Sequence, residues 1–409
     1  MKVLHVNYYD LKGGAAIGVN RLHNALLDKG LESKILVSEK TSNEEKIIGP
    51  VSTLEQLKNQ ARISLARFVK RNLMKTSNKE TFSFNYLNTT ILDKINNIDT
   101  DLVHLHWIGN EMISISQLRK IKKPIVWTFW DMWPICGAEH HSSDNRHIEG
   151  YNNNNRPENE SGFDLNKIIW NNKKKNFNFD FIITTPSQWF LEIVKKSFLF
   201  KDKEIHHIPL NIDCSIWRQR DKNLAKEMFD INTTKKNLLF GSATSTDDRK
   251  GFDFLIKLFK EKKLNNYQLL IFGEKPKNLK NLEVDYKYLG RIKDSHTLTL
   301  LYSLADILLM PSKIELFGQI GMEANACGTP AIIFENTGAS DYIKHKFNGY
   351  ISKYLDVEDF KQGIDYIIND ENNYETISQN CQKHIKDNFN NEKISSKFIE
   401  IYKKLINKK

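Results

Sequence analysis

The sequence predicts an α/β protein with two Rossmann-like domains, each built on a parallel sheet. The chain has 409 residues, more than one hydrophobic core usually supports, so two domains are expected. Short apolar runs alternate with amphipathic helical patterns, which is the rhythm of βαβ units. This rhythm stops near residues 206–217 and then restarts. We therefore expect two parallel sheets that face each other across a cleft.

In the first half, the strand patterns are VLHVN, SKILVS, DLVHLHW, PIVWTFW and FIITTPS, and RLHNALLDKG is a helical pattern between the first two. In the second half, the strand patterns are NLLFGSA, YQLLIFG, YKYLG, ADILLMPS and TPAIIF. Pro209 and its short apolar neighbours separate the halves, so we expect one domain at residues 1–209 and a second at 210–388. Residues 142–162 are polar and rich in asparagine, which predicts an exposed loop.

The composition is that of a folded protein and excludes several classes. Hydrophobic residues make up 40% and charged residues 27% of the chain, outside the range of disordered proteins. The net charge of +10 favours polyanionic partners, but the lysines are scattered among asparagines, as on solvated faces. The four cysteines lack CxxC spacing, which argues against a zinc site and a disulfide framework.

The beginning of the chain has no features of a targeting segment. MKVLHVNYYD reads as a strand, without a charged region followed by a long apolar run. The longest apolar runs are much shorter than the about 20 residues that span a bilayer. We expect a cytoplasmic protein that lies at the inner face of the cell membrane if it binds lipid.

A lipid contact is one of two interpretations of residues 54–75. Leu57, Ala61, Leu65 and Phe68 recur at helical spacing. A surface helix could pack this stripe on its domain, or the helix could lie on an anionic membrane surface. We favour the packed helix, because basic amphipathic helices are common in soluble proteins. The basic residues of the segment are Arg62, Arg67, Lys70, Arg71 and Lys75.

A glycine-rich turn follows the first predicted strand. Gly13 and Gly14 precede Ala15 where a helix begins, and small residues there let a ligand approach backbone N–H groups. The dinucleotide fingerprint GxGxxG requires glycine where this chain has Ala15, which argues against NAD binding. A tight turn with close strand–helix packing explains the glycines equally well.

The most specific segment is residues 311–330, which carries Glu315 and Glu323 eight positions apart. A strand is expected to end at Leu309, and a helix to begin near Gly318. Ligands bind outside the carboxyl ends of parallel strands, so this loop is expected to meet one. Its carboxylates could accept hydrogen bonds from sugar hydroxyls. The N–H groups from Phe317 to Ile320 would meet a diphosphate at the helix N-terminus.

This segment resembles the signature of glycosyltransferase family 4. The match consists of the two glutamates with seven residues between them, then Ala, Cys-Gly and Thr-Pro. The resemblance extends over most of the chain, through GGAA, HLHW, PIVWTFWDMWP, TPSQWF, IPLNID, RKGFDFL and NTGAS. It implies the GT-B fold and a retaining, metal-independent hexosyltransferase, and the most similar subgroup builds bacterial surface polysaccharides.

The resemblance also implies roles in a donor site of the second domain. Glu315 would contact the donor sugar near the reacting carbon, and Glu323 would hold the ribose hydroxyls. Lys250 matches the lysine that binds the diphosphate, where its charge offsets that of the leaving nucleotide. The family arginine upstream is absent from residues 242–245, so Arg249 is taken as its replacement. The expected donor-binding residues are Gly14, Ala15, Arg249, Lys250, Glu315, Phe317, Gly318, Gln319, Ile320 and Glu323.

The first domain departs from the family pattern. Family members commonly have His before Asp where this chain has Trp130 and Asp131. An indole can donate a hydrogen bond but cannot accept a proton as imidazole can, so altered donor preference or lost activity are both open. The residues expected to carry catalysis are Glu315, Lys250, Arg249 and Asp131.

Histidines and Trp130 are expected on the acceptor side. His104 and His106 are expected to point to opposite faces of their strand, with His106 toward the acceptor or in a structural role. His140 aligns with a histidine often seen in the subgroup, but no second ligand pair accompanies it and Glu139, so no metal is predicted.

We therefore expect an enzyme without a cofactor that uses a UDP- or GDP-linked sugar. The second domain would bind this donor, and residues 1–209 would bind a glycan or lipid-linked acceptor. Residues 389–409 would form a helix that packs back across the hinge. The alternatives are a non-catalytic nucleotide-sugar-binding protein and an RNA-binding protein. Only net charge supports the latter, without an RRM, KH or zinc-knuckle pattern, so no nucleic acid is expected.

Overall fold

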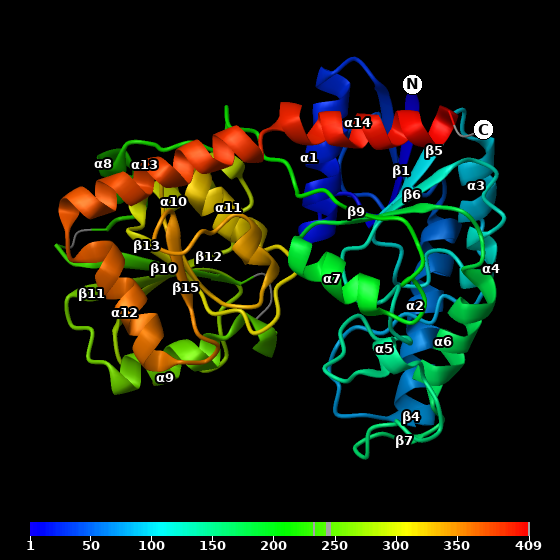
Figure 1. Ribbon diagram of the computed structural model, residues 1–409, viewed down its shortest axis with the longest axis horizontal. Coiled ribbons are helices and arrows are strands. Elements are labelled where there is room, and N and C mark those ends of the chain that lie inside the picture. Colours follow the sequence, from blue (N-terminus) through cyan, green and yellow to red (C-terminus); the bar gives the residue numbers. More distant parts are fainter. Residues whose placement is uncertain (232–233, 243–246, 408–409) are drawn as a thin grey trace. The chain divides into compact units, whose positions relative to one another are not determined.

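The computed structural model describes residues 1–231, 234–242 and 247–407. The chain forms two compact units (Figure 1). Unit 1 consists of Met1–Leu210 and Ile394–Lys409, and unit 2 of Asn211–Lys393. The sequence prediction placed these boundaries after residues 209 and 388. None of the helices in the described part of the chain has the length and apolarity needed to cross a bilayer.

Unit 1 is built on a seven-stranded sheet in the order β3-β2-β1-β5-β6-β8-β9, with every neighbouring pair parallel. The direction of the strand order reverses between β1 and β5, which is where ligands bind in such sheets. The strands are β1 (Lys2–Tyr9), β2 (Glu32–Glu39), β3 (Ile47–Ile48), β5 (Leu102–Leu105), β6 (Ile125–Thr128), β8 (Ile182–Thr185) and β9 (Ile205–His207).

Side-chain caps mark several helix starts in unit 1, for example Ser52, whose hydroxyl accepts from the Glu55 N–H. The helices are α1 (Gly14–Asp28), α2 (Thr53–Leu73), α3 (Ile91–Asn97), α4 (Ile115–Leu118), α5 (Arg146–Glu149), α6 (Leu165–Asn176), α7 (Gln188–Lys196) and α14 (Asn391–Asn407). A small antiparallel pair joins β4 (Met74–Lys75) to β7 (Ser161–Gly162).

Helix α14 belongs to the core of unit 1 although it is far from it in sequence. Ile394, Phe398 and Tyr402 pack with Val3 of β1 and Leu26 of α1. Figure 1 shows α14, in red, beside α1 and the sheet. Its apolar residues recur every three or four positions, so one face of the helix is buried.

The predicted loop at residues 142–162 is more ordered than its polarity indicates. It contains α5 and β7. The Arg146 side chain is 3% exposed and pairs with Asp144 at 2.9 Å and Glu160 at 3.3 Å. Hydrophilicity alone predicted an exposed segment, but paired charges can be buried.

Unit 2 has a six-stranded parallel sheet in the order β12-β11-β10-β13-β14-β15. Its order reverses between β10 and β13. The strands are β10 (Lys236–Ser242), β11 (Tyr267–Gly273), β12 (Asp285–Gly290), β13 (Ile307–Met310), β14 (Ala331–Phe334) and β15 (Gly349–Ser352).

Helices of unit 2 bury apolar stripes against this sheet. Phe254 and Phe360 come from two helices and meet Phe334 of β14 at ring distances of 4.9 and 5.5 Å. The helices are α8 (Lys222–Met228), α9 (Phe252–Glu261), α10 (Ser295–Leu304), α11 (Gln319–Ala326), α12 (Val357–Ile368) and α13 (Glu371–Asn388), with short turns η1 (Asp248–Lys250), η2 (Leu279–Asn281) and η3 (Gly338–Asp341).

Candidate functional site

In unit 2, the loops that follow β10 and β13 meet where the strand order reverses. Gly251 has a φ of +75°, and a Cβ added there would lie 1.9 Å from the carbonyl oxygen of Pro311. Only glycine fits both the left-handed conformation and this approach. The contact brings η1 beside the loop that leads into α11.

This approach joins Lys250 to Glu315. The Lys250 Nζ lies 2.6 Å from the Glu315 Oε2, and the two side chains are 28% and 13% exposed. The carboxylate oxygen also lies 3.4 Å from the Ser312 hydroxyl. A cation and a carboxylate therefore stand together, partly open to solvent, at the carboxyl edge of the sheet.

Arg249 is held differently from its neighbour Lys250. Its Nε and Nη2 donate to the two carboxylate oxygens of Asp247 at 2.8 and 2.9 Å. Burial acts to raise the pKa of Asp247, but the hydrogen bonds and charge of Arg249 outweigh it and lower that pKa. The structure does not bring the guanidinium into the Lys250–Glu315 pair. Residues 243–246, which include positions taken for the missing upstream arginine, lie outside the described residues.

Helix α11 begins one residue after the predicted Gly318. Gly318 is the N-cap with a φ of +81°, and the half-buried Gln319 and Ile320 form the first turn. The N–H groups of such a turn and the helix dipole favour an anion. The Phe317 side chain is 4% exposed and packs 5.2 Å from the Tyr342 ring, so the backbone is the part of Phe317 left to meet a ligand.

Two tyrosines that sequence reasoning missed hold this helix. The Tyr302 hydroxyl donates to the Glu323 Oε2 at 2.9 Å, and Glu323 itself is 6% exposed. The Tyr342 hydroxyl donates to the Gly318 carbonyl oxygen at 2.5 Å. Nothing in the local pattern around Tyr302 or Tyr342 marks these contacts, because each joins segments separated by a strand.

In unit 1, the helix N-terminus proposed for donor contact begins after Gly13. Gly13 has a φ of +86°, and a Cβ added there would meet nothing within 4 Å. Gly14 is exposed and Ala15 is half-buried. A side chain at Gly13 would thus be limited by the left-handed backbone conformation and not by neighbouring atoms.

Asp131 accepts hydrogen bonds from three donors of its own domain. Its carboxylate accepts from the Trp107 indole at 2.6 Å, the His140 Nδ1 at 2.5 Å and the Trp133 N–H at 2.9 Å. Burial acts to raise the pKa of Asp131, but the neighbouring His140 and these hydrogen bonds leave it lowered. These three hydrogen bonds hold the Asp131 carboxylate in place within unit 1.

His140 continues this network to Ser83. Its Nε2 lies 2.7 Å from the Ser83 hydroxyl, which also accepts from the Asn110 N–H at 2.8 Å. The connectivity is that of a Ser-His-Asp triad. Ser83 is 0% exposed, however, and His140 is 3% exposed, so the serine meets no substrate in this structure.

Trp130 points toward α1 and the sheet. A Cβ added to Gly18 would lie 2.3 Å from the Trp130 Cη2, so the indole fills the space that this glycine leaves. The ring packs against the cluster that includes Val19 and Ile35. Its Nε1–H donates to the His106 Nδ1 at 3.2 Å. Trp130 is half-buried, whereas His106 is only 2% exposed.

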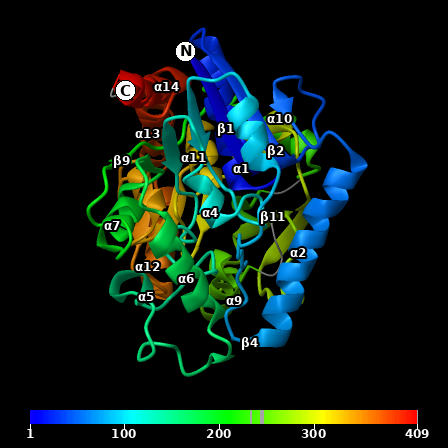
Figure 2. The same ribbon diagram turned by 90° about the vertical axis from the view of Figure 1, so that its right-hand side faces the viewer.

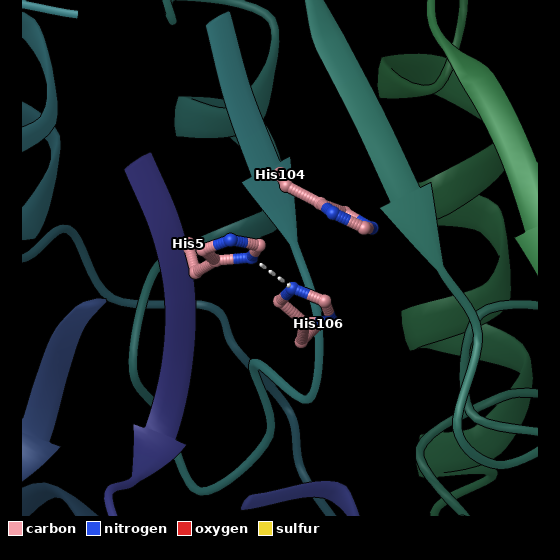
Figure 3. Close-up of side chains that lie close together, drawn as sticks. All are labelled: His5, His104 and His106. Carbon is pink, nitrogen blue, oxygen red and sulfur yellow. Dashed lines mark hydrogen bonds between the residues drawn. The ribbon is translucent and has the colours of Figure 1, made fainter. Parts of the chain in front are cut away.

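The prediction that His104 and His106 point to opposite faces was wrong. Residues two apart on a strand share a face, and the two ring centroids lie 4.0 Å apart. His5 of β1 joins them, and Figure 3 shows the three rings together. Burial lowers the pKa of each, to about 3 for His104, so all three imidazoles are neutral near pH 7.

This cluster has the residue types of a metal site, but its histidine nitrogens are already engaged in hydrogen bonds. The Trp130 indole can only donate, so the His106 Nδ1 is an acceptor and its Nε2 carries the proton. That proton is donated to the His5 Nδ1, 2.9 Å away. Both nitrogens of His104 are taken by Tyr402 and Thr128, at 2.7 Å each. The lone pairs that a metal would need are therefore occupied while Trp130 stays in place.

Aromatic residues that sequence reasoning missed occupy the open part of this edge. The Tyr9 and Trp107 rings stack with centroids 6.1 Å apart, and both residues are half-buried. Asn110 donates to the Tyr9 hydroxyl at 3.1 Å. Of the predicted acceptor-side residues, His106 and His140 lie beneath this surface.

The two Rossmann-like units define the GT-B fold class. Sucrose-phosphate synthase from Thermosynechococcus elongatus has the same fold, with a TM-score of 0.71 at 16% identity over 100% of both chains. A structure of Anabaena HepE in complex with UDP-glucose matches with a TM-score of 0.67 at 15% identity, over 99% of this chain and 100% of that one.

Within unit 2, residues 224–384 match the model of glycosyl transferases group 1. CapM of Staphylococcus aureus, a capsular polysaccharide biosynthesis glycosyltransferase, is 28% identical over 45% of this chain and 50% of its own length. The first three curated relatives are matched over 39% to 54% of their length.

Proposed function

We propose that the protein is a retaining, metal-independent hexosyltransferase acting on a nucleotide diphosphate sugar. The acceptor would be a glycan or lipid-linked saccharide in bacterial polysaccharide biosynthesis. The observation that carries the proposal is the Lys250–Glu315 pair beside the N-terminus of α11. The likeness to a fold that holds UDP-glucose in HepE and to the capsular enzyme CapM supports it.

The proposed chemistry needs no cofactor. The bond between the anomeric carbon and the diphosphate oxygen breaks, and a bond from the acceptor oxygen to that carbon forms on the same face. The acceptor proton passes to the departing phosphate oxygen. Lys250 and the N–H groups at α11 would stabilise the charge on the UDP or GDP that leaves, and Glu315 would orient the sugar.

The first test is a thermal-shift screen against UDP- and GDP-sugars, because a bound ligand raises stability by linkage. Transfer is then measured with the stabilising donor for wild type, Glu315→Ala and Lys250→Ala. We expect both variants to lose most of the activity while they stay folded. Equal activity in all three proteins would remove these residues from the site.

A non-catalytic nucleotide-sugar-binding protein is the second candidate. It is favoured by Trp130, whose indole lies against α1, and by Asp131, whose carboxylate already accepts three hydrogen bonds from the protein. Saturable donor binding with neither transfer nor hydrolysis across a panel of acceptors would support this candidate over the transferase.

We further propose that α2 binds an anionic membrane surface, which would place the protein in the cytoplasm at the inner face of the membrane. Figure 2 shows α2 as a long helix that ends at β4. The favoured interpretation, in which its apolar stripe packs on the domain, was wrong. Leu57 is 62% exposed, Leu65 49% and Phe68 57%, and no residue of α2 is buried.

Polar residues attach α2 to unit 1 instead. Glu55 pairs with Lys94 at 2.6 Å, and the Asn59 amide donates to the Ser38 carbonyl at 3.3 Å. The Lys70 Nζ lies 3.5 Å from the centre of the Phe82 ring, and burial lowers its pKa to about 8. The apolar stripe therefore faces away from the domain, as on helices that lie in a membrane interface.

Sedimentation with vesicles tests this membrane contact. Vesicles that contain phosphatidylglycerol should retain wild type and release a Leu57→Ser, Leu65→Ser, Phe68→Ser variant. Charge is tested by Arg67→Gln with Arg71→Gln, because both arginines are exposed whereas Lys70 is not. Leu224→Ser, at a residue 55% exposed in unit 2, is the control. Equal retention of all variants would contradict the proposal.

A further inference from the structure

Two buried tyrosine hydroxyls hold the two ends of the candidate donor site on α11. Tyr302 comes from α10 and Tyr342 follows η3, and both are 0% exposed. One donates to the side chain of Glu323 and the other to the backbone of Gly318. Neither tyrosine is exposed enough to touch a nucleotide, but each is one contact away from a group proposed to do so.

Tyr302 fixes the plane of a carboxylate. A glutamate side chain on a helix has several rotamers, and a hydrogen bond from a rigid donor selects one of them before the ligand arrives. The Tyr302 ring is itself held by Phe272 and Trp217, with ring centroids 5.9 and 6.0 Å away. Its hydroxyl thus presents Glu323 in a fixed orientation, which matters for a group that accepts from two neighbouring hydroxyls.

Tyr342 fixes the direction of a peptide bond. The carbonyl of Gly318 and the N–H of Gln319 belong to one planar trans peptide unit, so a hydrogen bond that holds the carbonyl also aims the N–H. The Gly318 carbonyl accepts from the Gly321 N–H at 3.0 Å as well. The hydroxyl fits because added Cβ atoms would lie 3.1 Å from it at Gly318 and 2.4 Å at Gly321.

We propose that Tyr302 and Tyr342 are positioning residues with separate duties. Tyr302 acts through Glu323 on recognition of the ribose hydroxyls, and Tyr342 acts through the Gly318–Gln319 peptide on recognition of the diphosphate. The inference rests on the proposed function, since it takes a nucleoside diphosphate as the ligand of unit 2.

The test compares Tyr302→Phe with Tyr342→Phe, each of which is the matched control for the other. Calorimetric titration uses UDP or GDP, whichever the wild type binds, and the 2′,3′-dideoxy form of the same nucleotide. We expect Tyr302→Phe to weaken binding of the normal nucleotide about tenfold, the effect of losing one hydrogen bond to a charged group. Binding of the dideoxy form should not change.

Tyr342→Phe should instead weaken both nucleotides by the same factor and reduce the preference for diphosphate over monophosphate. Glu323→Gln provides a second route if Tyr302→Phe does not fold. It should lose discrimination between ribose and dideoxyribose, and Tyr302→Phe should add no further loss in that background.

The outcomes separate the inference from the function that it rests on. If Tyr302→Phe weakens the normal and dideoxy nucleotides equally, or weakens neither, the inference is overturned and the donor site stands. If the wild type binds neither UDP nor GDP, the proposed function is overturned and the inference with it.

Discussion

Units 1 and 2 are both built on a parallel sheet, but the charged side chains at the carboxyl ends of the strands are arranged differently in the two units. In unit 2, the partly open Lys250 and Glu315 pair beside a helix N-terminus. In unit 1, Asp131 and His140 are buried and bonded to each other beside tryptophans. The same edge can thus present charged groups to a ligand or use them to fix a loop. Residue type alone does not reveal which, because the difference lies in how many protein donors each carboxylate already has.

The largest expected effect tests whether the unit 2 edge is the reactive one. Lys250→Met should lower kcat by about 10²- to 10³-fold, since a group that stabilises developing charge is worth about 2.7–4 kcal/mol. Lys313→Met is the matched control, because Lys313 pairs with Asp253 at 2.6 Å in the same loop region. Steady-state kinetics with the donor found by screening measure both variants. Equal loss in the two would show that only net charge matters.

Acid should destabilise unit 1 before unit 2. Burial lowers the pKa of His5, His104 and His106, and that of His23 to about 4. In the unfolded chain, a histidine binds a proton below its usual pKa of about 6.5, whereas in the folded protein these four histidines stay neutral at that pH. The free energy of unfolding is therefore highest above pH 6.5 and decreases as the pH falls. Each such histidine lowers the free energy of unfolding by about 2 kcal/mol as the pH falls from 6.5 to 5.

Hydrogen exchange at pH 7 and pH 5, corrected for intrinsic rates, resolves this difference by peptide. In unit 2, His384 is the described histidine with a lowered pKa. Protection that falls equally in the sheets of both units would contradict the comparison.

A smaller effect concerns the packing of Trp130 on α1. Gly18→Ala should cost about 1–2 kcal/mol of unfolding free energy, because the added Cβ would lie 2.3 Å from the indole Cη2. Trp130→Phe lacks that atom, so the double variant should be more stable than the sum of the single changes predicts. Denaturant unfolding of the four proteins measures the coupling. Strict additivity would show that the two residues do not meet.

The smallest expected effect is on α2. Replacing Leu57, Leu65 and Phe68 by serine should change the unfolding free energy by less than about 0.5 kcal/mol for each substitution, because these side chains are exposed. Denaturant unfolding measures this for the same variant used with vesicles. A large loss of stability would show that the stripe is packed after all.

The sequence predicted the parts of the molecule that local patterns encode. Strand β13 ends at Met310, one residue after the predicted Leu309, and α11 begins directly after Gly318, near which a helix start was predicted. Glu315 lies in the loop between β13 and α11, and Glu323 lies on α11, as the sequence predicted.

What the sequence could not predict depends on contacts between distant segments. Helix α2 has two faces, and only the positions of Lys94, Ser38 and Phe82 decide which of them docks. The hydroxyls of Tyr302 and Tyr342 reach α11 from separate elements. The sequence was sufficient to predict that His104 and His106 share one face of their strand, because side chains two residues apart point the same way. The prediction that they point to opposite faces was therefore an error of interpretation.

Because of helix α14, the two units complete their cores at different times during synthesis. Unit 2 is one uninterrupted stretch, Asn211–Lys393, and can close its core as soon as it has left the ribosome. Unit 1 begins earlier but lacks Ile394, Phe398 and Tyr402 until nearly 200 further residues have been made. The hydrogen bond between the His104 imidazole and the Tyr402 hydroxyl likewise forms only after Tyr402 has been synthesised. The half of the protein that is translated first is therefore the last to be finished.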